Sequence, residues 1–222
     1  MKYLRTIIFL LAILVISACE IEKVEVEWDN ETVPNSELEK SNNTAVAEEF
    51  IISPEGIGNA KLGMSLGELK QISDRNTEFK NEPNFMVNIN AIAVSKSGVT
   101  QYYILYLAGT TSHPDRITIL MTDNPNYQTQ EGVKVGTSIQ EAEAIYGKAT
   151  LSYNTASESR EYVTFADRPD SRIKFRTNWF NVGFAGIYPP TSEEYRQTQE
   201  FKDTAIIRAI EVSCAPINCP KP

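Results

Sequence analysis

A short internal repeat constrains the fold of this chain more than any other feature of its sequence. Residues 61–72 (KLGMSLGELKQI) and 134–145 (KVGTSIQEAEAI) are identical at five of twelve positions, and two further positions exchange one aliphatic residue for another. In each copy a serine is followed three residues later by a glutamate, which is the signature of a capping box at a helix N-terminus. The predicted helix-cap residues are Ser65, Glu68, Ser138 and Glu141.

Strand-like segments follow both predicted helices. They are 85–95, 99–108 and 116–122 in the first half, and 150–153, 160–166, 172–177, 181–187 and 206–213 in the second. A short helix is predicted at 192–198, after a Pro-Pro pair. The segment 206–213 could extend that helix, but its similarity to 116–122 favours a closing strand.

This order of elements predicts an α+β fold made of two tandem modules. Each module is a capped helix followed by an antiparallel β-meander, with the helices packed on one face of the sheet. The repeats cover about 54–127 and 128–219, and one half alone, at about 75 residues, is marginal for a core of its own. We therefore expect a single globular domain over residues 50–219.

The N-terminus has the features of an export signal. A short positive region precedes an apolar run at 6–16, which is shorter than the roughly 20 residues of a membrane-spanning helix. Residues 16–19 (ISAC) resemble the bacterial lipobox, and this implies that residues 1–18 are removed and that Cys19 carries lipid. The alternative is an ordinary signal peptide with a chance cysteine. A lipid on Cys19 would anchor the protein to the cell membrane or outer membrane, with its domain facing the periplasm or exterior.

The segment between signal and domain, 19–49, carries the negative charge of the chain. Residues 20–49 hold ten acidic and two basic residues, a balance of −8, which equals the formal net charge of the whole chain. A same-sign segment of low hydrophobicity is typical of a disordered tether, and an acidic docking tail is the alternative. The acidic balance also argues against nucleic acid as a partner.

The two C-terminal cysteines predict a disulfide rather than a metal site. Export would place Cys214 and Cys219 in an oxidising compartment, where two nearby cysteines are expected to form a disulfide. Two thiols and a single histidine leave too few ligands for a transition metal, so neither a metal nor a cofactor is expected.

Aromatic and basic side chains gather on two predicted strands. On 99–108 both faces are apolar, and on 172–177 three basic residues alternate with apolar ones and share one face. Central strands buried on one side would explain this pattern. A partner-binding sheet surface is the functional alternative, because Tyr, Trp and Arg are common in interface hot spots. The partner-binding candidates are Tyr102, Tyr106, Arg172, Lys174, Arg176, Trp179 and Phe180.

Ser65 also lies in a G-x-S-x-G pattern, the nucleophile elbow of hydrolases, and Asp74 and His113 follow in triad order. The elbow needs a strong strand before it, whereas residues 55–60 are rich in turn formers. The repeat keeps Ser138 but lacks the second glycine. A helix cap explains both serines and a hydrolase explains one, so no catalytic residue is predicted.

The two helix starts resemble the opening motif of helix-and-sheet modules in bacterial envelope lipoproteins. The residues that carry this resemblance are Gly63-Met64-Ser65 with Glu68, and Gly136-Thr137-Ser138 with Glu141 and Tyr146-Gly147. The outer-membrane assembly lipoproteins of the SmpA/OmlA (BamE) type have one such module, and the β-lactamase inhibitor proteins have two in tandem. The resemblance implies a non-catalytic module that binds another envelope protein across an exposed sheet face. A periplasmic binding protein for a small molecule or cell-wall component is the alternative.

Overall fold

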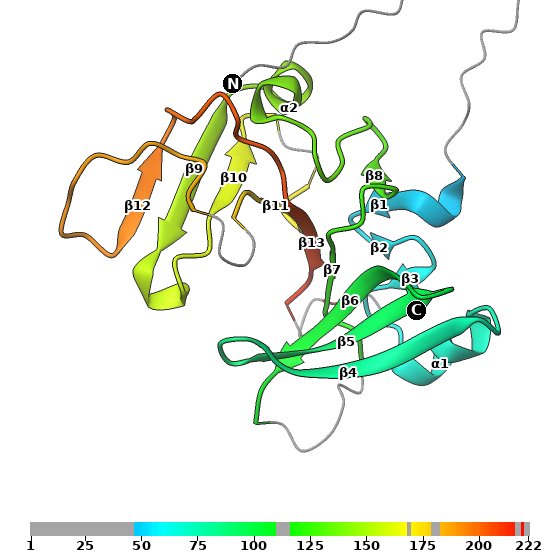
Figure 1. Ribbon diagram of the computed structural model, residues 1–222. Helices are drawn as coiled ribbons and strands as arrows, with labels where there is room; N and C mark the ends of the chain where they lie inside the picture. Colours follow the sequence, from blue (N-terminus) through cyan, green and yellow to red (C-terminus); the bar gives the residue numbers. More distant parts are fainter. Residues whose placement is uncertain (1–46, 110–115, 168–169, 179–182, 216–218, 220–222) are drawn as a thin grey trace, which may run out of the picture. The chain divides into compact units, whose positions relative to one another are not determined.

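Two β-sheets account for most of the regular structure in the part of the chain that the computed structural model describes (Figure 1). That part comprises residues 47–109, 116–167, 170–178, 183–215 and 219. All of these residues belong to one compact unit, Thr44–Pro222. Within them the chain forms thirteen strands, two α-helices and two short 3-10 helices.

Nine strands form one antiparallel sheet, and strands from the two halves of the sequence meet in its interior. The strand order is β12-β9-β10-β11-β13-β7-β6-β5-β4. At the junction, β13 pairs with β7 and places Val212 opposite Leu120 (Figure 1). The strands are β4 (Thr77–Met86), β5 (Ile89–Lys96), β6 (Val99–Leu107), β7 (Ile119–Thr122), β9 (Ala149–Asn154), β10 (Tyr162–Phe165), β11 (Ile173–Arg176), β12 (Tyr195–Thr198) and β13 (Ala209–Ser213).

A smaller sheet has four short strands in the order β3-β2-β1-β8. Its one parallel pair, β1 with β8, joins the start of the domain to the segment that precedes the second helix. The strands are β1 (Ile51–Ser53), β2 (Gly56–Ile57), β3 (Ala60–Lys61) and β8 (Gln128–Thr129). The 3-10 helices are η1 (Glu48–Phe50), directly before β1, and η2 (Thr155–Ser157), directly after β9.

The two α-helices are α1 (Leu66–Ile72) and α2 (Ile139–Tyr146). Both begin with the capping box that the repeat predicts. The Ser65 hydroxyl accepts the Glu68 N–H at 3.2 Å, and the Glu68 carboxylate accepts the Ser65 N–H at 2.7 Å. Ser138 and Glu141 repeat this arrangement at 3.1 and 2.9 Å. In both boxes the backbone hydrogen bond from the serine lowers the pKa of the glutamate.

Replacing Ser65 with alanine is expected to lower the free energy of unfolding by about 1 kcal/mol, because the first turn loses the acceptor of one N–H. Ser138→Ala should cost about the same. Ser65→Asp should be nearly neutral, since aspartate caps well and suits the helix N-terminus. Denaturant unfolding measures all three. The hydrolase interpretation would be restored by two results together. The unfolding midpoint would be unchanged in the variants, and the wild type would hydrolyse an ester that neither Ser65 variant hydrolyses.

The predicted fold class is wrong. The protein is mostly β, and its helices have only seven and eight residues, or about two turns each. The halves do not form two helix-plus-sheet modules, because their strands hydrogen-bond into one sheet through β7 and β13. A capping motif specifies where a helix begins, but it specifies neither the helix length nor which strands pair. Those are decided by contacts between residues far apart in the sequence.

Several predicted elements also differ from the structure. Within the predicted helix at 192–198, residues Tyr195–Thr198 form the edge strand β12, which pairs with β9. The predicted strand at 85–95 contains the turn between β4 and β5, where Asn88 adopts a φ of 59°. Asparagine tolerates this left-handed conformation, so the turn forms without glycine. Of 181–187, the described residues 183–187 form no strand. β13 lies within the predicted closing strand at 206–213.

Strand β4 was not predicted, and its sequence shows why. Glu78, Lys80 and Glu82 interrupt its apolar residues, and Pro83 lies near its end. These are the residues that natural proteins place on an exposed sheet edge, where they discourage pairing with another chain. Their charge makes the segment look like a loop in the sequence.

Buried apolar side chains lie on both faces of the large sheet. The larger cluster joins the sheet to both helices and the small sheet, and its members Leu69, Leu120 and Ile139 are fully buried. The smaller cluster lies on the opposite face around Leu105 and Met121. Both faces of β6 are therefore covered, which agrees with the apolar character of both faces in its sequence.

A buried carboxylate, Glu161, holds the segment after β11 against the second half of the sheet. Its side chain accepts hydrogen bonds from Thr177 Oγ1 at 2.5 Å and from the Ala185 and Gly186 N–H groups at 2.7 and 2.9 Å. The Tyr188 hydroxyl donates the fourth at 2.9 Å. Burial and the charge of Glu161 raise the pKa of Tyr188, which therefore remains a donor.

Candidate functional site

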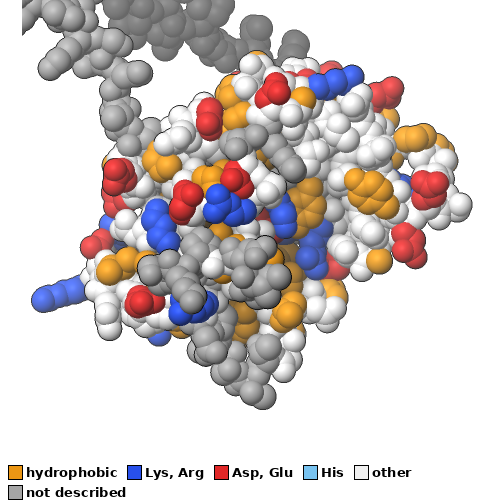
Figure 2. All heavy atoms as spheres, turned by 180° about the vertical axis from the view of Figure 1, so that it is seen from behind, with side chains coloured by type: hydrophobic (Ala, Val, Ile, Leu, Met, Phe, Trp, Pro, Cys, Tyr) orange, Lys and Arg blue, Asp and Glu red, His pale blue; other side chains and the backbone are white. Residues whose placement is uncertain are grey.

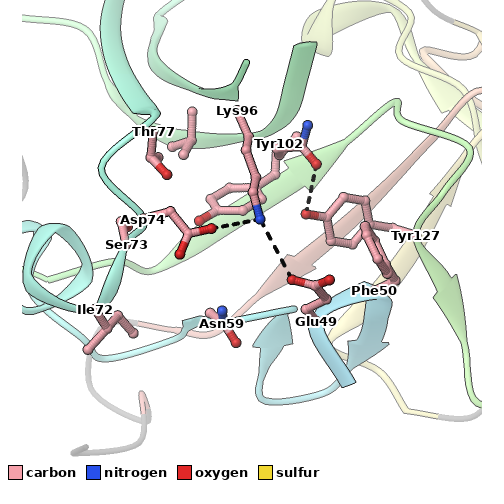
Figure 3. Close-up of a pocket in the computed structure, with 12 residues that line it drawn as sticks. Glu49, Phe50, Asn59, Ile72, Ser73, Asp74, Thr77, Lys96, Tyr102 and Tyr127 are labelled. Atoms are coloured by element: carbon pink, nitrogen blue, oxygen red, sulfur yellow. Dashed lines mark hydrogen bonds and ion pairs between the residues drawn. The ribbon is translucent and has the colours of Figure 1, made fainter. Parts of the chain in front are cut away.

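A cavity of about 130 Å³ lies where the start of the domain meets the end of α1 and the hairpin β5–β6 (Figure 3). Aromatic side chains and charged side chains both line it. The lining residues are Glu49, Phe50, Asn59, Ile72, Ser73, Asp74, Thr77, Val94, Lys96, Gln101, Tyr102 and Tyr127. They come from six separate stretches of the sequence, so only the tertiary fold assembles the site.

One wall of the cavity is formed by η1, which lies close to the backbone of Gly58. Gly58 has a φ of 54°, and a Cβ at this position would clash with the Glu49 carbonyl oxygen. Because Gly58 has no side chain, η1 can pack against it. The Phe50 ring then meets the Tyr127 ring edge-on, with centroids 5.5 Å apart. Tyr102 contacts Tyr127 in the same way at 6.3 Å. Three aromatic rings thus line one side of the cavity.

A β-bulge in the hairpin β5–β6 directs two consecutive side chains into the site. Val94 pairs with Tyr102 but Ser95 pairs with Thr100, so Gln101 is an extra residue on β6. The Gln101 side chain accepts a hydrogen bond from the Tyr127 hydroxyl at 3.3 Å. Burial, with a contribution from the charge of Glu49, raises the pKa of Tyr127 to about 12, so its hydroxyl stays protonated at neutral pH.

Lys96 lies across the mouth of the cavity between two carboxylates (Figure 3). Its ammonium is 2.7 Å from an Asp74 oxygen and 3.9 Å from a Glu49 oxygen. The hydrogen bond to Asp74 raises the pKa of Lys96 and keeps this side chain charged. These three are the charged residues of the lining, so the two carboxylates outnumber the ammonium.

The geometry of this cavity is suited to binding. Among the described residues, no group of three or more His, Cys, Asp or Glu side chains could hold a metal ion. The rings offer apolar contact, and the charged mouth offers orientation, which are the two parts of a recognition site. Ser65, the serine of the hydrolase alternative, donates its hydroxyl proton to Glu68 at 2.8 Å within the capping box. His113 lies outside the described residues.

Those predicted partner-binding residues that the structure describes do not form one surface. Tyr102 is 6% exposed and lines the cavity, and Tyr106 packs against the larger core cluster on the same face. The basic side chains of β11 lie on the other face, because they alternate with Ile173, which shares the face of Val212. Trp179 and Phe180 lie outside the described residues.

Each basic residue of that group has an acidic or aromatic neighbour within the fold. Arg172 binds both carboxylate oxygens of Asp170, at 3.1 and 3.0 Å, and Lys174 contacts Glu211 at 3.3 Å. Arg176 is 4% exposed and lies 5.7 Å from the centroid of the Tyr162 ring. Burial lowers the pKa of Arg176. Arg176 is therefore a core residue rather than a side chain that a partner could reach.

The two cysteine predictions fall in different parts of the chain. A disulfide joins Cys214 to Cys219, which ties the end of the chain back to the last strand. Cys19 and the signal segment 1–18 lie outside the described residues, as does the predicted tether up to residue 46. Within the described part, no helix is both long enough and apolar enough to span a bilayer.

Most residues of the cavity were missed by sequence analysis. Glu49 was placed in the tether, whereas the structure has it in η1, against the domain. Asp74 was considered only for a hydrolase, and Lys96 and Tyr127 attracted no prediction. One usable signal is Phe50, an aromatic residue that ends an acidic run and directly precedes a strand. Such a residue is typical of the point where a polar tether docks on a core.

The exterior offers few other clues to function. On the face shown in Figure 2, acidic and basic side chains are interspersed, with apolar patches among them. No family model, no curated protein and no solved structure matches this chain. The assignment of a function therefore rests on the site and on the sequence signals alone.

Proposed function

We propose that this protein is a lipid-anchored envelope lipoprotein whose domain binds another protein without catalysis. Its cavity would receive an anchoring side chain from the partner. The observation that carries the proposal is the aromatic-lined cavity between η1, α1 and the hairpin β5–β6. Buried aromatic pockets at the centre of a contact surface are where interface binding energy concentrates.

The size of the cavity favours a side chain over a free metabolite. Sites for drug-sized ligands have volumes of about 300–1,000 Å³. A cavity of roughly 150 Å³ in another protein accommodates benzene, so a cavity of about 130 Å³ suits one ring or one side chain. Two exposed apolar residues, one in the lining and one paired with Lys96, would extend the contact beyond the cavity. Ile72 is 54% exposed, and Val99, opposite Lys96 on the hairpin, is 56% exposed.

The anchoring half of the proposal comes from the sequence. The lipobox-like residues 16–19 and the acidic stretch that follows are the features of a lipoprotein on a tether. The chain enters the domain at η1, and Glu49 and Phe50 form a wall of the cavity. A partner that fills the cavity would thus contact the domain close to the point where the tether joins it.

A photo-crosslinking residue in place of Ile72 should capture one discrete partner in the native envelope. Ile72 lines the cavity and is exposed, so a partner seated there lies within reach of the probe. Tyr127→Ala in the same protein should abolish the adduct, because it removes the ring between Phe50 and Tyr102. The measurement is a gel shift of the tagged protein, with mass spectrometry of the adduct.

The matched control carries the same probe at Tyr195, on the edge strand β12. Tyr195 is 54% exposed, as Ile72 is, but it does not line the cavity. It should give no adduct of the same mass. An adduct common to both positions, or one that survives Tyr127→Ala, would contradict binding through the cavity.

A further inference from the structure

The geometry of the cavity points to the chemistry of its ligand. We propose that it binds a primary ammonium group, presented as a lysine side chain of the protein partner. In the free protein, Lys96 occupies the position of that ammonium. That the partner is a protein rests on the proposed function. The preference for an ammonium group rests on the cavity itself.

The charges at the mouth favour a cation. Asp74 and Glu49 both face the Lys96 ammonium, at 2.7 and 3.9 Å (Figure 3). When Lys96 swings away, two carboxylates remain among the lining residues with no cation between them. An incoming ammonium would restore the charge balance, and an incoming carboxylate would meet repulsion.

The hydroxyl of Tyr102 is a third hydrogen-bond acceptor in the lining of the cavity. The Tyr102 side chain is 6% exposed, and its hydroxyl makes no hydrogen bond with any residue that the structure describes. It lines the cavity, and burial raises its pKa, so the neutral hydroxyl is available as an acceptor. The hydroxyl oxygen is not among the described side-chain atoms that are fully buried without a partner, so water reaches it from the cavity, and an N–H group of a ligand could replace that water.

The number of acceptors matches the number of donors on an ammonium. A primary ammonium has three N–H donors and no acceptor. The cavity offers the carboxylates of Asp74 and Glu49 and the hydroxyl of Tyr102. The alkyl stem of a lysine would contact the apolar part of the lining, to which Ile72 and the ring of Phe50 contribute from opposite sides (Figure 3). An ammonium near aromatic rings also gains from their quadrupoles.

Breaking the ion pair between Lys96 and Asp74 costs little free energy. Its side chain is 42% exposed, and the Asp74 carboxylate that it contacts most closely is 60% exposed. Ion pairs this exposed contribute little, because water competes for both partners. Lys96 also follows the bulge at the end of β5, so its side chain can turn into water without breaking the hairpin.

The test uses n-butylammonium chloride as a probe of the lysine side chain. Titration into the intact domain at low ionic strength, followed by NMR of the Tyr102 and Tyr127 ring signals, gives a dissociation constant. Wild type should bind weakly, because Lys96 competes. Lys96→Met should bind at least about tenfold more tightly, because the competing charge is gone. n-Butanol and butyrate should not bind either protein measurably.

A matched lysine variant separates this effect from a general change in charge. Lys80 makes a surface ion pair with Glu82 at 2.7 Å and does not line the cavity. Lys80→Met should therefore bind the probe as wild type does. In the Lys96→Met background, Asp74→Asn should weaken binding about tenfold and Tyr102→Phe about fivefold, since each removes one acceptor. Unfolding midpoints of all variants establish that each one folds.

Two outcomes overturn the inference. One is equal affinity of Lys96→Met and Lys80→Met for n-butylammonium, and the other is equal binding of n-butanol. If either is seen while the Ile72 crosslink still depends on Tyr127, the inference fails and the proposed function stands. If the probe binds as expected but no crosslink forms, the ammonium site stands and the protein partner is refuted.

Discussion

Glu161→Ala is expected to lower the free energy of unfolding by about 4 kcal/mol. The Glu161 side chain is fully buried, and four donors converge on its two carboxylate oxygens. Alanine would leave two backbone N–H groups and the hydroxyls of Thr177 and Tyr188 buried without this acceptor. Each such group costs about 1–3 kcal/mol, reduced where relaxation or water can satisfy it.

Thermal unfolding provides the measurement for Glu161→Ala. For a domain of this size a loss of 4 kcal/mol corresponds to a fall in Tm of roughly 8–16 °C. Tyr188→Phe should cost only about 1 kcal/mol, because it removes one donor and leaves the carboxylate with three. Glu200 is exposed, and Glu200→Ala should change stability by less than about 0.5 kcal/mol. A Glu161→Ala protein as stable as Glu200→Ala would show that the buried carboxylate is not a structural centre.

Cys19→Ala is expected to release the protein from the membrane or to leave its signal segment uncut. The proposed lipid chains would hold the mature protein in a detergent phase, because each buried methylene contributes about 0.8 kcal/mol. Two acyl chains therefore shift the partition by many orders of magnitude. Phase partitioning in detergent, together with the mass of the mature N-terminus, measures both effects.

The matched control is the double variant Cys214→Ala and Cys219→Ala. It removes the disulfide but keeps the proposed lipid site, so the protein should stay in the detergent phase. Normal cleavage of Cys19→Ala with unchanged partitioning would refute lipidation. That result would leave the binding domain without an explanation for its tether-like N-terminal segment.

Local signals in the sequence predicted local structure. Both capping boxes are present, because each consists of hydrogen bonds between residues three apart in the chain. The Cys214–Cys219 disulfide has the same character, since its partners are five residues apart. The closing strand β13 was identified from its similarity to 116–122, and in the structure these two segments pair as β13 and β7.

Non-local contacts explain what the sequence did not predict. The segment 192–198 begins after two prolines and carries polar residues that suit a short helix, yet its residues 195–198 pair with β9 as a strand. Strand β4 carries charges that resemble a loop, yet it pairs with β5 along most of its length. In both cases an edge position in a larger sheet overrode the local preference. Sheet pairing supplies hydrogen bonds that a short isolated helix or loop lacks.

The candidate site also combines features that the sequence shows with features that only the tertiary structure shows. Phe50 and Tyr102 could be recognised in the sequence as apolar residues with a place in the core. The sequence does not show that their rings meet Tyr127, or that Asp74 and Glu49 both face Lys96. These contacts depend on the left-handed conformation of Gly58 and on the bulge at Gln101. The sequence by itself determined the helix starts and the disulfide partners. It also carries the proposed lipid anchor, which stays a prediction. Only the tertiary structure decided that the sheet is continuous and that a cavity exists, because both arise from contacts between distant segments.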